Sequence, residues 1–159
     1  YAAKKLYEDG KFVEAIAKYD EAIDAETNAD KKAQMLFSKA SIQFRKLSQY
    51  STARSTAYEA AKLKPGWGRP YMLIRDMYGK AARSCGDAWN QRLVILAAID
   101  KYAYAKSIDA EVAEEASARA ASYYGSMPDS ETGFMRGIKE GATVNTGCWV
   151  SENVRVRYK

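Results

Sequence analysis

The two cysteines, Cys85 and Cys148, carry the most reactive side chains of this 159-residue sequence. A catalytic thiol is usually activated by a neighbouring base, most often a His, and the sequence contains no His. The absence of His also removes the commonest general base, the commonest protein ligand of zinc, copper and haem iron, and every catalytic triad built on an imidazole. The sequence therefore excludes most hydrolase and metalloenzyme mechanisms. We expect no catalytic, cofactor-binding or metal-binding residues.

Two other patterns that could support chemistry are incomplete. Gly66 and Gly68 precede an expected helix, but they lack the third Gly and the Lys-Ser/Thr pair of a phosphate-binding loop. Acid pairs such as Asp20-Glu21 are adjacent in sequence, so on a helix their carboxylates point about 100° apart and cannot form a catalytic dyad. These patterns favour a non-enzymatic protein.

The cysteines fit a disulfide better than a catalytic role. Each lies beside a glycine and outside the regular apolar pattern, whereas an inert structural cysteine more often lies on a buried face. Two cysteines permit at most one bridge. We predict a disulfide between Cys85 and Cys148, which would attach the C-terminal end of the chain to its middle. Two separate buried thiols are the alternative.

The charge of the chain is unevenly distributed. Its net charge of +5 divides into −4 for residues 1–30, +11 for residues 31–106 and −2 for residues 107–159. A basic middle segment favours anionic partners through its electrostatic field, although exposed Lys and Arg side chains usually form solvated helix faces. Binding of a polyanion, either a nucleic acid or a charged glycan, is therefore the alternative function. No nucleic-acid-binding motif supports it.

An internal repeat indicates the architecture. The length and the 47% of hydrophobic residues fit one compact domain or one short repeat array. A constant offset of 38 residues aligns aromatic with aromatic and alanine with alanine, in the pairs Phe12 and Tyr50, Ala15 and Ala53, and Ala22 and Ala60. Small residues recur where two helices must approach closely, with aromatic residues between them. The pattern predicts paired helices.

This pattern resembles the tetratricopeptide repeat (TPR), a helix-turn-helix unit of about 34 residues. The resemblance covers residues 1–109 and implies about three helix pairs, the first truncated and the third lengthened by an insertion that contains Cys85. The expected fold class is all-α: a right-handed helical solenoid with a capping helix and a small C-terminal β-hairpin. Because the first pair begins partway through a helix, we expect the natural chain to continue N-terminally.

The last fifty residues are expected to close the array. Residues 110–125 place apolar residues at helical spacing with acids opposite, which suits the capping helix that a repeat array requires. Residues 126–159 are expected to form a short helix and a β-hairpin, because β-branched and aromatic residues, Trp149 among them, lie between turn-forming segments. In the final strand Val154 and Val156 should face opposite to Arg155 and Arg157.

A second resemblance concerns the C-terminal part of the chain. It rests on Cys85-Gly86, residues 92–102, Gly147-Cys148-Trp149 and residues 154–157. Together they resemble the C-terminal end of bacterial cell-envelope proteins with TPR repeats. The resemblance covers about residues 80–157 and implies a location in the periplasm or cell envelope, without an assigned activity. No run of about 18 apolar residues is present, so we expect no membrane-spanning segment.

The TPR resemblance also implies a binding surface, because these repeats bind peptides or protein surfaces along a concave wall formed by the first helix of each pair. A helical wheel places the following residues on that wall: Lys39, Ile42, Arg45, Lys46, Arg69, Met72, Leu73, Asp76 and Lys80. Lys4, Tyr7 and Glu8 would line its beginning. The carboxylate clamp of the family, which uses Lys and Asn, is absent, because Ser38 and Ile42 occupy its positions in the second repeat, as Met72 and Asp76 do in the third.

The expected function follows from this wall. Basic and apolar side chains together favour an acidic, partly apolar peptide or protein surface. We therefore expect a scaffold or adaptor that binds a protein partner and needs no cofactor. Trp67, Trp89 and Tyr58 lie outside the core pattern and are further candidates for partner contact.

Overall fold

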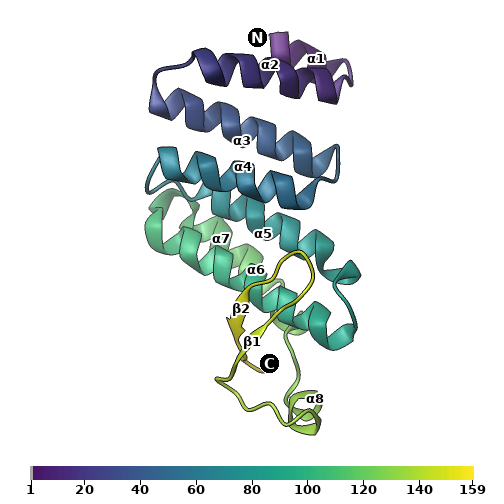
Figure 1. Cartoon of the computed structure of the whole chain (residues 1–159). Coiled ribbons are helices and arrows are strands. Elements are labelled where there is room, and N and C mark those ends of the chain that lie inside the picture. The colour runs from purple at the N-terminus through teal and green to yellow at the C-terminus, as the bar shows by residue number, and fades with distance from the viewer. Residues whose placement is uncertain (1) are drawn as a thin grey trace. The chain divides into compact units, whose positions relative to one another are not determined.

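The computed structural model describes residues 2–159, which are mostly helical with one small antiparallel sheet (Figure 1). The elements are α1 (Ala2–Glu8), α2 (Phe12–Ala25), α3 (Ala29–Arg45), α4 (Tyr50–Leu63), α5 (Arg69–Ala81), α6 (Ala88–Ile108), α7 (Ala113–Ala121), α8 (Ser130–Met135), β1 (Thr143–Asn145) and β2 (Asn153–Arg155). The helical class expected from the sequence is confirmed. Among these helices, none has both the length and the apolar character needed to cross a membrane. The chain divides into two units, Tyr1–Pro70 and Tyr71–Lys159.

The repeat in the sequence recurs in the structure of the first unit. Helices α2 and α4 both have 14 residues and begin 38 residues apart, at Phe12 and Tyr50. Lys11 (φ −92°, ψ 74°) and Gln49 (φ −91°, ψ 69°), which precede them, have nearly the same backbone conformation. Both carbonyls accept from the alanine four residues later, which is fully buried in each case. Equivalent sequence blocks thus adopt equivalent local structures.

Small residues let the helices of the first unit pack closely. Consecutive helices lie against one another, with α3 along both α2 and α4 (Figure 1). Helices α3 and α4 make the most extensive contact, and both carry fully buried alanines: Ala33, Ala40, Ala53, Ala57 and Ala60. Around Ile23, Met35 and Leu36, larger side chains complete an apolar cluster. One buried polar link joins α3 to α4, where the Thr56 hydroxyl donates to the Gln43 side-chain oxygen at 2.8 Å.

Helix α6 is central to the second unit. With 21 residues, α6 is the longest helix described. Asp87 caps the N-terminus of α6, because its carboxylate accepts from the backbone N–H of Asn90 at 2.9 Å. Buried residues lie all around α6, because α7 packs on it as well as β2. A helix that is apolar on all sides needs such cover.

The expected capping helix is interrupted in the structure. A 3₁₀ turn covers Ala110–Val112, α7 runs over Ala113–Ala121 only, and a second 3₁₀ turn covers Tyr124–Ser126. Asp109 starts this region in an extended conformation, and its carboxylate accepts from the Glu111 N–H at 3.0 Å. Asp109 therefore ends α6 and caps the 3₁₀ turn that follows.

The C-terminal hairpin is shorter than expected. Strands β1 and β2 pair antiparallel over three residues each, with Val144 opposite Val154. Val154 and Val156 are buried while Arg155 is exposed, so the predicted alternation is confirmed at these positions. The assignment of Trp149 to a strand is wrong. Trp149 lies in the loop between β1 and β2, where its ring packs against Tyr78 at a centroid distance of 5.5 Å.

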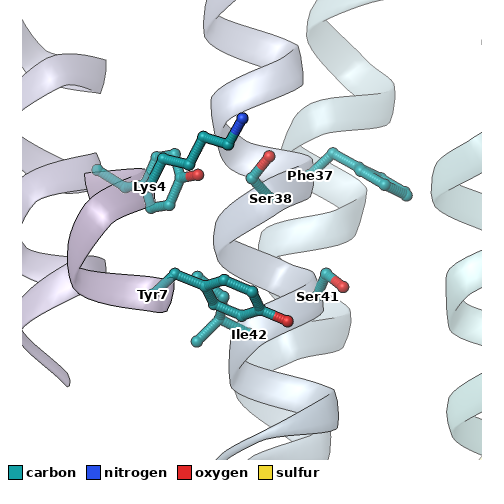
Figure 2. A pocket seen from close by; sticks show the side chains of 7 residues that line it. Lys4, Tyr7, Phe37, Ser38, Ser41 and Ile42 are labelled. Carbon is teal, nitrogen blue, oxygen red and sulfur yellow. The ribbon is translucent and has the colours of Figure 1, made fainter. Parts of the chain in front are cut away.

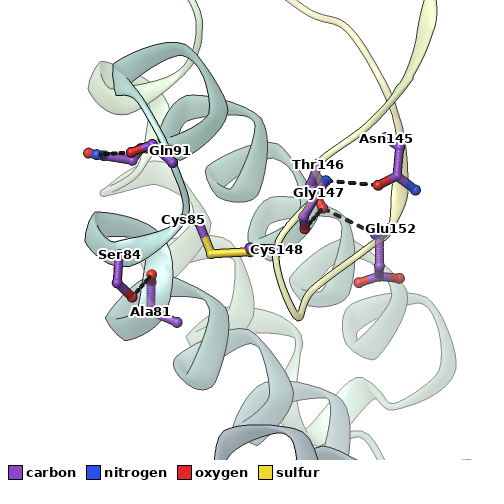
Figure 3. Close-up of a disulfide and its surroundings, with 10 residues drawn as sticks. Ala81, Ser84, Cys85, Gln91, Asn145, Thr146, Gly147, Cys148 and Glu152 are labelled. Atoms are coloured by element: carbon purple, nitrogen blue, oxygen red, sulfur yellow. Dashed lines mark hydrogen bonds between the residues drawn. A yellow bond between two sulfur atoms is a disulfide. The ribbon is translucent and has the colours of Figure 1, made fainter.

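The structure contains the predicted disulfide between Cys85 and Cys148 (Figure 3). The two Cα atoms are 5.4 Å apart across a sequence separation of 63 residues. Cys85 is buried and follows a 3₁₀ turn in which the Ser84 hydroxyl donates to the Ala81 carbonyl. Cys148 lies in the loop that starts where the Asn145 side chain accepts from the Gly147 N–H at 2.8 Å. The bridge joins the hairpin loop to the α5–α6 connection.

Candidate functional site

A cleft of about 210 Å³ opens between α1 and α3 in the first unit. It is lined by Lys4 and Tyr7 of α1, by Phe37, Ser38, Ser41 and Ile42 of α3, and by Tyr19 of α2. Figure 2 shows Lys4 and Tyr7 reaching from α1 toward the residues of α3. Cofactor and drug-sized ligands occupy pockets of about 300–1,000 Å³. The cleft is smaller than these and suits one or two side chains of a partner.

Helix α1 presents its two cleft residues on one face. Lys4 and Tyr7 are three positions apart, so their side chains are neighbours on the helix surface. The helix ends at Glu8, and two residues later Gly10 has a φ of +77°, which lies in the left-handed region. The Gly10 N–H donates to the Tyr7 carbonyl at 3.0 Å and the Lys11 N–H donates to the Leu6 carbonyl at 2.8 Å. This C-terminal motif fixes the turn that holds Tyr7.

Helix α3 supplies the opposite wall by the same spacing rule. Ser41 and Ile42 follow Ser38 by three and four positions, so both are its neighbours on the helix surface. Asn28 starts the helix, because its side chain accepts from the Lys31 N–H at 3.0 Å. Phe37 packs against Trp67 with ring centroids 5.2 Å apart, which anchors that part of the wall.

The cleft combines hydrogen-bond donors with an apolar floor. The ammonium group of Lys4 and the hydroxyl groups of Tyr7, Tyr19, Ser38 and Ser41 can donate hydrogen bonds, and among residues 2–159 no carboxylate lines the cleft. Ile42 is only 4% exposed and forms part of the floor. Such a site favours an anionic or carbonyl-bearing group attached to an apolar one.

Of the other predicted groove residues of the first unit, one lies beside a cleft residue and two make different contacts. The Lys46 ammonium lies 5.8 Å from the Tyr7 ring centroid, so it adds positive charge beside the cleft. Lys39 instead forms an ion pair with Asp20 of α2 at 2.6 Å. The Arg45 guanidinium lies over the Phe44 ring at 5.1 Å. Lys4, Tyr7 and Ile42 line the cleft as predicted, whereas Glu8 is exposed outside it.

The prediction that Met72 and Leu73 offer an exposed apolar surface is wrong. Each is 3% exposed, and Met72 belongs to an apolar cluster with Tyr102 and Val112. Helix α5 is buried around most of its circumference, as its core residues show: Met72, Leu73, Ile74, Met77 and Tyr78. A helix of this kind has no apolar wall to offer a partner. Only Arg69 and Lys80, at the two ends of α5, are exposed.

The prediction of partner contact by Trp89 is also wrong. Trp89 is 5% exposed, with the Tyr158 ring centroid 6.5 Å from its own and the Arg136 guanidinium 5.3 Å from it. Trp67 is half-buried against Phe37, and Tyr58 remains exposed. Tyr158 of the C-terminal tail packs against Trp89, and the spacing of apolar residues along the helices could not predict this contact.

Asp76 is part of a polar cluster that the sequence did not predict. Its carboxylate pairs with the Arg75 guanidinium and with Arg119 at 3.4 Å, and it accepts from the Tyr102 hydroxyl at 3.3 Å. Arg75 is 8% exposed and lies between two rings, 4.1 Å from the centroids of both Tyr102 and Tyr123. The sequence signal that could have indicated this cluster is the adjacent Arg75-Asp76 pair within the otherwise apolar segment 70–78. Asp76 is therefore engaged within the second unit rather than offered to a partner.

Burial raises the pKa of the Tyr102 phenol well above its ordinary value, although the nearby Arg75 charge opposes the shift. The neutral phenol thus contributes stability below about pH 10, and this contribution is lost as the pH rises further, because the unfolded chain ionises first. We expect Tyr102→Phe to reduce the alkaline fall in unfolding free energy by up to about 1.4 kcal/mol per pH unit. Urea unfolding between pH 8 and about pH 11 measures this slope. Tyr124→Phe, which removes an exposed phenol, is the control, and equal slopes for the two variants would contradict the prediction.

Within residues 2–159, no three His, Cys, Asp or Glu side chains gather closely enough to hold a metal ion. Comparison of the chain with family models, with curated proteins and with solved structures finds no match. The function is therefore inferred from the chemistry of the cleft between α1 and α3.

Proposed function

We propose that the chain is a non-enzymatic protein-interaction module, a scaffold or adaptor, that binds an acidic, partly apolar peptide or protein surface. The observation that carries this proposal is the cleft between α1 and α3, where five lining residues carry hydrogen-bond donors beside an apolar floor and where no carboxylate of residues 2–159 takes part. A Glu or Asp side chain of the partner would take the donors. A neighbouring apolar side chain would contact Ile42 and Phe37.

The repeat structure supports a binding role of this type. Helices α2 and α4 repeat at a fixed offset, and helix pairs of this kind bind segments through the faces of their first helices. We propose a TPR-like right-handed solenoid of about three helix pairs, made of α1 with α2, α3 with α4, and α5 with α6. In that arrangement α1 and α3 are the first helices of their pairs, which is where the cleft lies.

The proposed location is the periplasm or cell envelope. Disulfides form and persist in oxidising compartments and are rare in the cytosol of mesophiles. The bridge between Cys85 and Cys148 supports a protein that works outside a reducing compartment.

The role of the cleft can be tested with a charge reversal at Lys4. We expect Lys4→Glu to weaken binding of a fluorescent peptide that alternates Glu and Leu by roughly tenfold, since the variant repels the carboxylates that the cleft should attract. Lys5→Glu is the matched control, because Lys5 is exposed on the same helix but does not line the cleft. Fluorescence anisotropy with the full chain gives both affinities.

The result also separates the peptide hypothesis from polyanion binding. Equal weakening by Lys4→Glu and Lys5→Glu would show attraction by overall charge and contradict a specific cleft. A polyanion site predicts a steep linear fall of log affinity with log salt and tight binding of heparin. A peptide held partly by Ile42 and Phe37 should keep more of its affinity when salt rises from about 50 mM to about 200 mM.

A further inference from the structure

We propose that the second unit contains a separate binding site for a small organic anion, a phosphate or carboxylate that bears a short apolar chain. The site is a cleft of about 430 Å³ between the α5–α6 connection, the first half of α6 and the turn after α7. Its volume falls within the range of about 300–1,000 Å³ typical of small-molecule sites. The residues that would recognise a ligand are Arg83, Gln91, Arg92, Ile95, Tyr123 and Ser126.

The charge of this cleft is positive. Arg83 and Arg92 line it, and no Asp or Glu of the described residues does. Arg92 is half-buried and donates to the Met127 carbonyl at 2.9 Å, which holds its guanidinium in place. Arg83 is exposed, and within residues 2–159 its guanidinium takes part in no ion pair or hydrogen bond. Arg83 is therefore available to bind an anion in a planar, bidentate geometry.

Two carboxylates that lie close in sequence to cleft residues, Asp87 and Asp129, have partners of their own. Asp87 accepts from the Asn90 N–H at the start of α6 and pairs with Arg136 at 3.2 Å. Asp129 accepts from the N–H and the hydroxyl of Thr132, and these bonds, together with the charges of Arg92 and Lys159, lower its pKa. These acids keep their negative charge near neutral pH but do not enter the cleft.

Two hydroxyl groups complete the polar side of the cleft. Tyr123 lies directly against Gly79, and a Cβ atom at that position would overlap its hydroxyl. The Arg75 guanidinium covers the Tyr123 ring, so the orientation of the phenol is fixed. The Ser126 N–H donates to the Tyr123 carbonyl at 2.9 Å, which places the Ser126 hydroxyl in the same turn. Both hydroxyls can donate to an oxyanion that Arg83 binds.

Part of the cleft wall is apolar. Ile95 and Ala82 are 7% and 5% exposed, so only a small part of each borders the cleft. An inorganic ion alone would leave this wall hydrated, whereas a ligand with a short alkyl chain would bury it. The geometry therefore favours an amphiphilic anion over a simple one.

The test uses three probes that share one chain: hexyl phosphate, hexanoate and hexanol. We expect at least one of the two anions to bind the full chain and hexanol not to bind detectably, and the stronger anion identifies the headgroup. Arg83→Gln should weaken that binding by roughly tenfold, because it removes a charged, bidentate donor. Arg155→Gln is the matched control, since Arg155 is exposed in the same unit and outside the cleft.

Titration calorimetry gives the affinities, and NMR shifts of the Ile95 methyl groups and the Ser126 amide locate the bound probe. The inference is overturned if neither anion binds, if hexanol binds as tightly as the anions, or if Arg83→Gln and Arg155→Gln bind equally. Shifts confined to residues outside the cleft would also overturn it. None of these results depends on the peptide cleft between α1 and α3, so the two proposals fail separately.

Discussion

The double variant Cys85→Ala/Cys148→Ala should unfold with a free energy about 4 kcal/mol lower than that of the wild type. The bridge closes a segment with a sequence separation of 63 residues, and a loop of this size strongly restricts the unfolded chain. That segment includes α6 and α7, so the loss affects the cooperative core of the second unit.

The hairpin should nevertheless stay in place in the native state of this variant. Val150, Val154 and Val156 are each no more than 2% exposed. Two ion pairs also join the tail to α6, between Arg157 and Asp100 at 2.8 Å and between Lys101 and Glu152 at 3.0 Å. We therefore expect native circular dichroism spectra and a lower urea midpoint, rather than a chain that cannot fold.

Urea unfolding followed by circular dichroism measures the effect. Reduction of the disulfide in the wild-type protein is the control, because it also removes the bridge. Wild-type protein treated with a reducing agent should unfold at nearly the midpoint of the double variant, on which the reductant should have no effect. Two thiols that react in denatured, unreduced wild type would show that the bridge is absent. Equal midpoints for the oxidised wild type and the variant would contradict its contribution.

Local sequence signals predicted much of the fold because they have local physical causes. The 38-residue offset predicted helices that begin at equivalent positions, since alanine at those positions permits close helix packing. The Asp87 cap was predictable because a carboxylate at the start of a helix accepts from a backbone N–H three residues later. The cysteine pairing followed from the small number of cysteines and their glycine neighbours.

Tertiary contacts decided the features that the sequence could not predict. A helical wheel for α5 assumes one buried face, but Met72 and Leu73 are buried as well as Ile74. The wheel works for α3, where Ser38 and Ile42 line the cleft. The cleft lined by Arg83 and Ser126 depends on segments about forty residues apart in sequence, so no local pattern indicates it.

Asp76→Ala should lower the unfolding free energy by about 3 kcal/mol, because it leaves a buried cation without its carboxylate. The Arg75 side chain is 9% exposed, and its Nε atom has no hydrogen-bond partner within residues 2–159. Its remaining neighbours are the rings of Tyr102 and Tyr123, which attract a cation more weakly than a carboxylate does. Arg119 is less affected, since its side chain is 44% exposed and also pairs with Glu115.

The converse variant, Arg75→Met, should cost only about 1 kcal/mol, because Asp76 keeps Arg119 and the Tyr102 hydroxyl as partners and methionine fills the space between the rings. In the double variant the uncompensated cation is gone, so its destabilisation should be less than the sum of the two single effects. Urea unfolding of the four proteins forms the double-mutant cycle. Additive effects, or an Asp76→Ala variant as stable as the wild type, would show that the two charges are not coupled. Effects smaller than additive would show that Asp76 neutralises Arg75 within the core of the second unit.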